Sequence, residues 1–334
     1  MSEEISSIGV VGGGAWGTAL ATVIARAGCS VRLWAREAEV VDAINTAHEN
    51  TTFLPGVPVD ASIHATNDLS EFAGVEAILL VTPAQVTRAV SENLKAHVGE
   101  GTPVAICAKG IERGTGKFMS EVLEETLPQA QTMVLSGPSF AADVARGLPT
   151  AITFAGPTVE GARPVAEAIA IASFRPYLSD DIIGAQVGGA VKNVLAIACG
   201  IVEGKGFGES ARAALTTRAF AELRRFGSSV GARPETLAGL SGLGDLILTC
   251  NSTQSRNMSL GLGLGQGKSM EEIMASRKSV AEGAHTAPIL TELATRAGID
   301  MPICNGVSDI VSGKAGVDQT IEELLNRPLR AEDE

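Results

Sequence analysis

The sequence predicts an α/β protein with a doubly wound parallel sheet in its N-terminal half and an all-α C-terminal domain. Over the first half, short apolar runs of strand type alternate with amphipathic segments of helix type. That alternation is typical of a parallel sheet with helices on both faces. After Asp181 the strand-type runs end and long helical patterns take over. We therefore expect two domains, one that contains the sheet over residues 1–180 and a helical one over residues 181–334.

The individual elements follow from local patterns. Strands are predicted where three to five residues are mostly apolar and turn residues flank them, namely at Ile8–Val11, Val31–Leu33, Ala77–Val81, Val104–Ala108, Met133–Leu135 and Ala151–Phe154. Helices are predicted where apolar residues recur with helical spacing, including Thr18–Ala27, Ile183–Val202, Ser210–Phe226 and Met270–Ser276. The glycine-rich run at residues 261–267 is interpreted as a flexible loop between helices.

Composition narrows the class of protein. The chain has 334 residues, 45% of them hydrophobic and 19% charged, which is typical of a soluble globular protein. Its net charge of -12 argues against sequence-independent binding of nucleic acid, which needs a basic surface, but leaves room for an anionic ligand in a local basic pocket. The most apolar helical stretch, Ala190–Val202, carries a lysine and is too short to cross a bilayer, so we expect no membrane span.

Cysteine and histidine spacing gives no sign of a metal site. The five cysteines stand far apart without a C-x-x-C pair, and the four histidines fall in no metal-ligand spacing. The N-terminus lacks the basic and apolar regions of a signal peptide. We therefore expect reduced thiols, no metal and a cytoplasmic location.

A glycine-rich turn marks the first strand-to-helix connection. Residues 12–17 read GGGAWG and contain G-x-G-x-x-G between a strand-type run and an alanine-rich helical stretch. In that context Gly12 permits the tight turn, Gly14 lets a pyrophosphate approach the backbone, and Gly17 lets helix and strand pack closely. The alternative is a glycine-rich turn without a ligand. The arrangement favours a Rossmann-type dinucleotide site in which amides at the start of the helix face the phosphates.

The end of the second predicted strand bears on which dinucleotide binds. An acidic residue there commonly binds the ribose hydroxyls of NAD, and this chain has Arg36 instead. An arginine can pair with the 2′-phosphate of NADP, while the adjacent Glu37 leaves room for NAD. A solvated arginine at the start of a helix is the other interpretation. The pattern favours NADPH and keeps NADH open.

Two lysines stand in settings that suit chemistry. Lys109 follows the strand-type run Val104–Ala108, at the edge of the sheet where doubly wound proteins bind ligands. Lys192 lies in an apolar helical stretch; its side chain can extend its charged end to solvent, or it can polarise a carbonyl and exchange a proton with the resulting alkoxide.

Three further segments are candidates for binding. Ser136–Phe140 closes a strand and opens a helix, so its amides and Ser139 can hold an anion, or can simply form an N-cap. Asp245, in a second glycine-rich turn, is either a helix cap or a functional carboxylate. The polar run Thr249–Asn257 surrounds Arg256 with short donors, which suits a phosphate but also a polar surface loop.

Taken together and in order, six motifs resemble the bacterial NAD(P)-dependent glycerol-3-phosphate dehydrogenases. They are GGGAWGT at 12–18, AKGIE at 108–112, SGPSFA at 136–141, VGGAVKN at 187–193, GLGDL at 242–246 and QSRN at 254–257. The resemblance covers about residues 7 to 325. It implies reversible reduction of dihydroxyacetone phosphate to sn-glycerol 3-phosphate with NADPH or NADH, for glycerophospholipid biosynthesis, by a homodimer.

The resemblance also implies site residues. Lys192 matches the proton donor and acceptor of the family. The positions that match substrate contacts are Lys109, Gly137, Ser139, Lys192, Asp245, Ser255, Arg256 and Asn257. Those assigned to the cofactor are Gly12, Gly14, Ala15, Trp16, Gly17, Arg36, Lys109, Ala141, Arg256, Val280 and Glu282. On their own pattern, the residues around Val280 and Glu282 would be interpreted as a loop.

Three positions depart from the family pattern, and two other functions compete. Ala15 stands where serine is common, Asp143 where glutamate is usual, and Gln186 where glutamate often precedes the glycine pair. A rival enzyme class is a two-domain hydroxyacid or keto-acid dehydrogenase of the ketopantoate or 6-phosphogluconate type. A nicotinamide-sensing regulator is the non-enzymatic rival, and it would need no lysine and no phosphate pocket.

Overall fold

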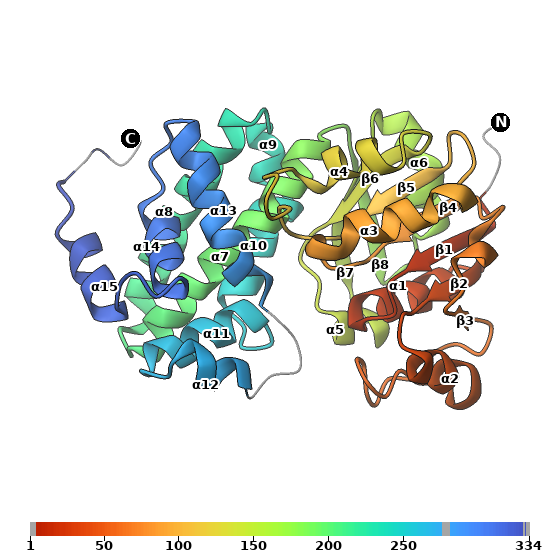
Figure 1. Cartoon of the computed structure of the whole chain (residues 1–334), viewed down its shortest axis with the longest axis horizontal. Coiled ribbons are helices and arrows are strands. Elements are labelled where there is room, and N and C mark those ends of the chain that lie inside the picture. Colours follow the sequence, from red (N-terminus) through yellow and green to blue (C-terminus); the bar gives the residue numbers. More distant parts are fainter. Residues whose placement is uncertain (1–4, 276–280, 330, 332–334) are drawn as a thin grey trace. The chain divides into compact units, whose positions relative to one another are not determined.

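A computed structural model describes residues 5–275, 281–329 and 331. In this part of the chain, eight strands form one sheet in the order β3-β2-β1-β4-β5-β6-β7-β8 (Figure 1). The strands are β1 Ser7–Val11, β2 Ser30–Trp34, β3 His64–Thr66, β4 Ala77–Leu80, β5 Pro103–Ile106, β6 Gln131–Ser136, β7 Thr150–Ala155 and β8 Phe174–Ser179.

Helices of the N-terminal half connect these strands. They are α1 Ala15–Arg26, α2 Ala38–Ala47, α3 Ala84–Leu94, α4 Met119–Thr126, α5 Ala141–Ala145 and α6 Val159–Ala168, with short turns η1 Leu69–Phe72 and η2 Lys95–His97. After β8, the regular elements among the described residues are all helices. It contains α7 Ile182–Gly204, α8 Gly208–Ser229, α9 Pro234–Leu237, η3 Leu240–Gly244, α10 Asp245–Cys250, α11 Arg256–Gly265, α12 Met270–Ala275, α13 Glu282–Arg296, α14 Pro302–Val311 and α15 Val317–Leu325.

The predicted fold class is confirmed, with one correction to the sheet. All six predicted strands are present, and the pairs from β3 through β6 are parallel. β7, however, pairs antiparallel with β6, and β8 pairs parallel with β7, so the last two strands run against the other six. β3 and β8 were not predicted. A short apolar run shows that a strand exists but not which way it runs.

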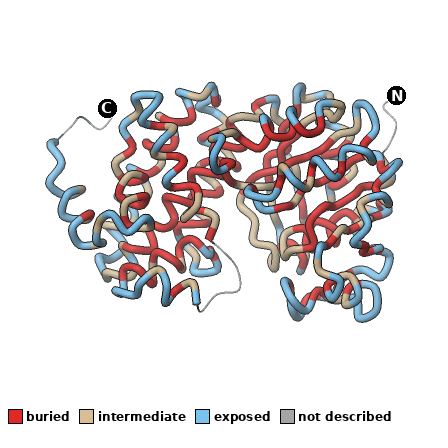
Figure 2. The backbone as a smooth tube through the Cα atoms, in the orientation of Figure 1, coloured by how far each residue is buried: buried red, intermediate tan, exposed pale blue. Residues whose placement is uncertain are grey.

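Alternate residues of each central strand point to opposite faces, and each face has its own core. In β4, Ala77 and Leu79 pack with residues of α1, α5 and α6, whereas Ile78 and Leu80 pack with residues of α3 and α4. The central strands β1, β4 and β5 are accordingly buried over all or nearly all of their length, in the part of the sheet that Figure 2 colours mostly as buried. Continuous apolar strands of this kind are expected when helices cover both faces.

The chain divides into two compact units. The first contains residues 1–189 and 231–245, and the second contains residues 190–230 and 246–334. The sheet and the helices α1 to α6 belong to the first unit, and α8 and α11 to α15 belong to the second. A boundary between residues 180 and 181 remains a prediction.

The glycine-rich run at 261–267 is largely helical, so its interpretation as a flexible loop is wrong. Residues 256–265 form α11. A Cβ atom at Gly261 would overlap the carbonyl oxygen of Ile197, and one at Gly200 would overlap that of Met258. Glycines at 204 and 265 repeat this arrangement one turn further along. Close backbone packing of α7 and α11 therefore explains glycines that helix propensity alone would assign to a loop.

The helix that contains Lys192 is longer than the sequence pattern predicted. α7 has 23 residues and is long and apolar enough to cross a membrane, so the expectation that this stretch is too short was wrong. In its most apolar window, 89% of the residues are buried inside the protein. That degree of burial is what a core helix shows.

The other predicted helices are confirmed within a few residues. α1 begins three residues before the predicted Thr18, α8 covers the predicted 210–226, and α12 ends at Ala275. Ser276, the last residue of the predicted 270–276 helix, lies outside the described residues. Differences of this size at helix ends are expected, because propensity specifies termini weakly.

Candidate active site

The glycine-rich turn has the geometry of a dinucleotide loop. Gly12 has a φ of +130°, and a Cβ atom there would lie 2.6 Å from the carbonyl oxygen of Val81. A Cβ atom at Gly17 would overlap the carbonyl oxygen of Gly12, so glycine is required for the helix to start so close to the turn. At Gly14 a Cβ atom would meet nothing within 4 Å. Two glycines therefore permit the local packing, and the third leaves open space above the backbone.

The start of α1 fits the phosphates of a dinucleotide. Gly14 is the N-cap and has no side chain to bond the first amides, and the described first turn, which includes Ala15 and Trp16, contains no acidic residue. Amides at a helix start attract anions, because their N–H groups point outward and the helix dipole is positive there. The space at Gly14 together with these amides is what a pyrophosphate needs.

A buried asparagine that the sequence patterns did not single out holds the turn in place. The side-chain amide nitrogen of Asn50 donates to the carbonyl oxygen of Gly13 and to the hydroxyl of Thr18, both at 2.8 Å. Asn50 is fully buried. A lone asparagine in the long connection after α2 gives no sequence signal for this role, because asparagine is common in turns.

Arg36 lies just past the C-terminal end of β2. Its side chain is 80% exposed and its guanidinium donates to the carboxylate of Glu37 at 2.6 Å. An arginine in such an exposed pair can turn to an added phosphate at little cost, since exposed ion pairs contribute about 0–1 kcal/mol.

Lys109 and Asp245 form an ion pair in the first unit. The ammonium of Lys109, which follows β5, lies 2.8 Å from a carboxylate oxygen of Asp245 and donates to the carbonyl oxygen of Gly137 at 3.0 Å. Their side chains are only 16% and 1% exposed. Because opposite charges attract more strongly where water is largely excluded, this pair fixes the direction of the lysine. Ser139 lies beside it, and its hydroxyl donates to the same Gly137 carbonyl at 3.2 Å.

The glycine pair of the VGGAVKN motif provides room for this arrangement. A Cβ atom at Gly189 would lie 3.2 Å from Cγ of Lys109 and 3.0 Å from the hydroxyl of Ser136. A Cβ atom at Gly188 would overlap the carbonyl oxygen of Ser241. Both glycines therefore let α7 approach the two turns that carry Lys109 and Asp245.

In the second unit, Lys192 is buried and bonds to a neighbouring hydroxyl. It is 6% exposed, and its ammonium donates to the hydroxyl of Thr249 at 2.7 Å. Thr249 lies on α10, four residues after Asp245. Since residues four apart share one face of a helix, Thr249 and Asp245 face the same way on α10.

Asn257 connects three helices of the second unit. Its side-chain nitrogen donates to the side-chain oxygen of Asn193 on α7, and its side-chain oxygen accepts from the amide of Gly283 on α13, both at 2.9 Å. A Cβ atom at Gly283 would overlap the carbonyl oxygen of Asn193. The structure thus brings Asn257 and the start of α13, where Glu282 lies, next to the residue that follows Lys192.

The remaining predicted site residues lie at helix starts. Ser255 is the N-cap of α11, where its hydroxyl accepts from the amide of Met258 at 3.2 Å, and the exposed Arg256 is the first residue of that helix. Ala141 is the first residue of α5, and Glu282 is the first of α13. Val280 lies outside the described residues.

One of the three departures from the family pattern has a clear structural role. The side-chain oxygen of Gln186 accepts from the amide of Ser120 at 2.9 Å, and its nitrogen donates to the Ser120 hydroxyl at 2.8 Å. Both residues are buried. The amide therefore satisfies both groups of Ser120 without placing a charge there.

No metal centre is found among the residues that the structure describes, since no three His, Cys, Asp or Glu side chains gather to hold an ion. The described residues do contain a glycine loop, an ion pair at Lys109 and a buried Lys192. These features are expected of a protein that binds a dinucleotide and acts on a small molecule. This combination defines the class of two-domain dehydrogenases with a Rossmann-type sheet.

Comparison with known proteins narrows the class. Residues 7–162 match the model of the NAD-dependent glycerol-3-phosphate dehydrogenase N-terminus, and residues 181–322 match that of its C-terminus. A glycerol-3-phosphate dehydrogenase [NAD(P)+] of Parvibaculum lavamentivorans is 61% identical over 99% of this chain and 100% of its own length. The one from Caulobacter vibrioides is 55% identical over 97% and 98%. This chain belongs to the NAD-dependent glycerol-3-phosphate dehydrogenase family.

Solved structures agree with this family assignment. The crystal structure of glycerol-3-phosphate dehydrogenase from Coxiella burnetii has a TM-score of 0.92 at 39% identity and covers 96% of this chain and 99% of its own. A ketopantoate reductase from Ralstonia eutropha has a TM-score of 0.59 at 18% identity over 94% of this chain and 99% of its own, and it shows a shared fold alone. The protein is an NAD(P)-dependent oxidoreductase, as its relatives are.

Proposed function

We propose that this protein catalyses the reversible, NAD(P)-dependent reduction of dihydroxyacetone phosphate to sn-glycerol 3-phosphate. The observation that carries the proposal is the 61% identity, over essentially the full length of both chains, with a glycerol-3-phosphate dehydrogenase [NAD(P)+]. The Lys109–Asp245 ion pair supports it, because a largely covered cation next to a carbonyl stabilises the negative charge that reduction places on oxygen.

Lys192 is the proposed proton donor. A bound NADPH or NADH supplies the hydride that reduces the carbonyl carbon and is left as NADP⁺ or NAD⁺. The carbonyl oxygen then needs one proton, and the Lys192 ammonium supplies it; in the reverse reaction the neutral amine takes it back. Burial supports this role, because the ammonium of a lysine that is 6% exposed interacts more strongly with the negative charge that develops on the oxygen than it would in water. The ion pair with Asp245, which fixes the direction of the Lys109 side chain, supports Lys109 as the group that polarises the same oxygen.

The phosphate of the substrate is assigned to the start of α11. Arg256 is exposed at the first position of that helix, where a guanidinium and the amides of a helix start suit a dianion. Ser255 and Asn257 flank it, and Gly137 and Ser139 are further proposed contacts of the substrate. Because Asn257 already bonds Asn193 and Gly283, we propose that it contributes mainly by holding the helix start in position.

The cofactor is assigned to the glycine loop and its surroundings. Gly12, Gly14, Ala15, Trp16 and Gly17 form the cradle of the pyrophosphate, as the open space at Gly14 supports. Arg36 would pair with the 2′-phosphate of NADPH. The further proposed contacts are Lys109, Ala141, Arg256, Val280 and Glu282.

The experiment follows reduced-nicotinamide absorbance when purified protein is mixed with dihydroxyacetone phosphate, with NADPH and NADH run in parallel. Ketopantoate serves as the control, because the rival enzyme class shares the fold. Consumption with dihydroxyacetone phosphate alone supports the proposal. Consumption with ketopantoate alone, or none despite measurable cofactor binding, rejects it.

Three further proposals concern the oligomeric state, the metabolic role and the cellular location of the protein. We propose a homodimer, which light scattering coupled to size-exclusion chromatography tests, and a role in glycerophospholipid biosynthesis, which follows from the proposed product. A cytoplasmic location is supported by the five cysteines, all of which are buried as free thiols. Fractionation of cells that express a tagged chain tests the location.

A further inference from the structure

The segment that carries Lys109 lies between β5 and α4 and needs support from outside itself. Residues 107–118 form no helix or strand, apart from an isolated bridge between Ile111 and Phe118. Lys109 nevertheless has to present its ammonium to Asp245 and Gly137 within hydrogen-bonding distance. A backbone without regular structure holds a side chain in place only where other groups fix it.

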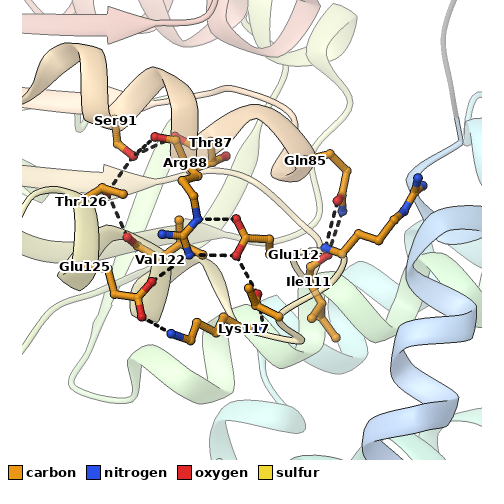
Figure 3. Close-up of polar contacts among 12 residues, drawn as sticks. Gln85, Thr87, Arg88, Ser91, Ile111, Glu112, Lys117, Val122, Glu125 and Thr126 are labelled. Atoms are coloured by element: carbon orange, nitrogen blue, oxygen red, sulfur yellow. Dashed lines mark hydrogen bonds and ion pairs between the residues drawn. The ribbon is translucent and has the colours of Figure 1, made fainter.

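Helix α3 fixes this segment through the side chain of Gln85. The Gln85 amide nitrogen donates to the carbonyl oxygen of Ile111 at 2.8 Å, and its oxygen accepts from the backbone amide of Arg113 at 3.0 Å. A single side chain thus bonds the backbone on both sides of Glu112, as the close-up in Figure 3 shows for Ile111.

Arg88, one turn further along α3, holds Glu112 itself. Its Nε and Nη2 atoms donate to the two carboxylate oxygens of Glu112 at 2.8 and 2.9 Å, a bidentate pair (Figure 3). The Glu112 side chain is 12% exposed, and the hydrogen bonds from Arg88 lower the pKa of its carboxyl below the usual value. A bidentate pair with one partner so well covered is stronger and more directional than an ordinary exposed pair.

Neighbouring groups complete the arrangement. Arg88 also donates to Glu125 on α4 at 2.8 Å, and Glu125 in turn pairs with Lys117. The hydroxyl of Thr115 donates to Glu112 at 2.6 Å. The segment is therefore tied to α3 and to α4, the helices on both sides of it in the sequence.

We infer that Gln85 and Arg88 are positioning residues for the reaction, which act by holding the segment 107–118 so that Lys109 points at the substrate carbonyl. Glu112 is only three residues from Lys109, so a shift of the backbone at Glu112 also displaces Lys109. The inference rests on the proposed function, since it assigns a catalytic consequence to the placement of Lys109. Misplacement of a reacting group by about 1 Å can reduce turnover on the order of a hundredfold.

The test is a double-mutant cycle between Arg88 and Lys109. Arg88→Ala is expected to lower kcat with dihydroxyacetone phosphate by roughly tenfold, with the Kd for NADPH within about twofold of wild type, because the glycine loop is untouched. In a Lys109→Ala background, the same change should lower kcat little further, since no lysine remains to be positioned. Arg88→Lys should rescue only in part, because an ammonium cannot form the bidentate pair.

Two controls separate a positioning role from general damage. Arg163→Ala removes an arginine from an exposed ion pair with Glu167 on α6, in the same unit, and should leave kcat unchanged. If Arg88→Ala does not fold, Gln85→Ala is the alternative, because it removes the two contacts of Gln85 with the backbone of the segment and keeps all the charges. Combined with Lys109→Ala, it should lower kcat little further than Lys109→Ala alone. Hydrogen exchange of peptides covering residues 107–118 should speed up in either variant.

The outcomes distinguish the inference from the proposed function. Wild-type protein that does not turn over dihydroxyacetone phosphate rejects the proposed function, and the hydrogen exchange then still reports whether α3 holds the segment. An active wild type with a folded Arg88→Ala variant of normal kcat overturns the inference alone. The inference is also overturned if kcat of the double variant falls by the product of the two single losses, because the two residues would then act independently.

Discussion

The ammonium of Lys192 lies 2.7 Å from the hydroxyl of Thr249, inside the helical unit and away from water. The hydroxyl accepts this hydrogen bond and so fixes where the lysine points on α7. A lysine held in this way can deliver a proton to one atom without first reorienting. This contact leads to the first prediction.

Replacing Lys192 with alanine should abolish most turnover and leave cofactor binding nearly intact. General acid catalysis contributes roughly 10² to 10⁴ in rate, so kcat should fall by about that factor. The Kd for NADPH, measured by fluorescence titration, should stay within twofold, because the glycine loop lies on other elements. Lys314→Ala on the surface of the same unit is the matched control, with 69% of its side chain exposed. Near-normal kcat in the Lys192 variant would remove this residue from the mechanism.

Arg36 should determine the preference between the two cofactors. Arg36→Ala removes the guanidinium that is proposed to pair with the 2′-phosphate, so kcat/KM should fall about tenfold for NADPH and change little for NADH. The ratio of the two kcat/KM values is the measurement. An unchanged ratio would mean that this exposed arginine only pairs with Glu37, as it does in the structure.

The glycine contact between α7 and α11 should be sensitive to a single methyl group. Gly261→Ala places a Cβ atom against the carbonyl oxygen of Ile197, where only backbone movement can make room. Overpacking of this kind costs about 1–3 kcal/mol, measured as the change in the free energy of unfolding by urea. Gly316→Ala is the control, because a Cβ atom there meets nothing within 4 Å. Equal stability of the two variants would argue against the tight packing of these helices.

The buried Glu222 should make the stability of the protein depend on pH. It accepts hydrogen bonds from the amides of Ile303 and Cys304 at the start of α14, but burial raises the pKa of its carboxyl from 4.5 to about 7. Because the folded pKa lies above the unfolded one, this contribution to stability is fully present below pH 4.5 and is lost as pH rises through about 7.

Glu222→Gln tests this directly, since glutamine does not ionise. Wild type should lose roughly 1 kcal/mol of unfolding free energy per pH unit between pH 5 and 7 relative to the variant. The measurement is urea unfolding at several pH values, with the wild-type and variant curves subtracted so that other titrating groups cancel. A difference that does not vary with pH would show that the carboxylate stays charged in the folded protein.

The main architecture could be predicted because the strands of a covered sheet are apolar throughout. β1, β2 and β4 to β7 appear in the sequence as such runs, whereas β3 has three residues and includes His64 and Thr66. β8 contains Arg175 and Pro176 and lies at the edge of the sheet, so half of it is polar. The direction of β7 depends on packing that no local pattern displays.

Sequence patterns proposed candidate site residues, but they could not show which of these residues contact one another. Lys109 and Asp245 are 136 positions apart, and their pairing is a result of the fold. Arg88 was missed for a similar reason, since a charged residue on an amphipathic helix usually faces solvent. Asn50 and Asn193 were missed because a buried amide that bonds other elements has no distinctive spacing.

The backbone contact between α7 and α11 also limits how this protein could be re-engineered. Each of the glycines at this contact packs directly against a backbone carbonyl group of the facing helix. No substitution can improve this contact, because every other residue is larger than glycine. Diversification aimed at new substrates would therefore yield folded variants from the exposed side of α8 or the turn before α15, and mostly misfolded chains from positions 200, 204, 261 and 265. Exposed positions of this protein can therefore vary, whereas the glycines between α7 and α11 cannot be replaced without disturbing the fold.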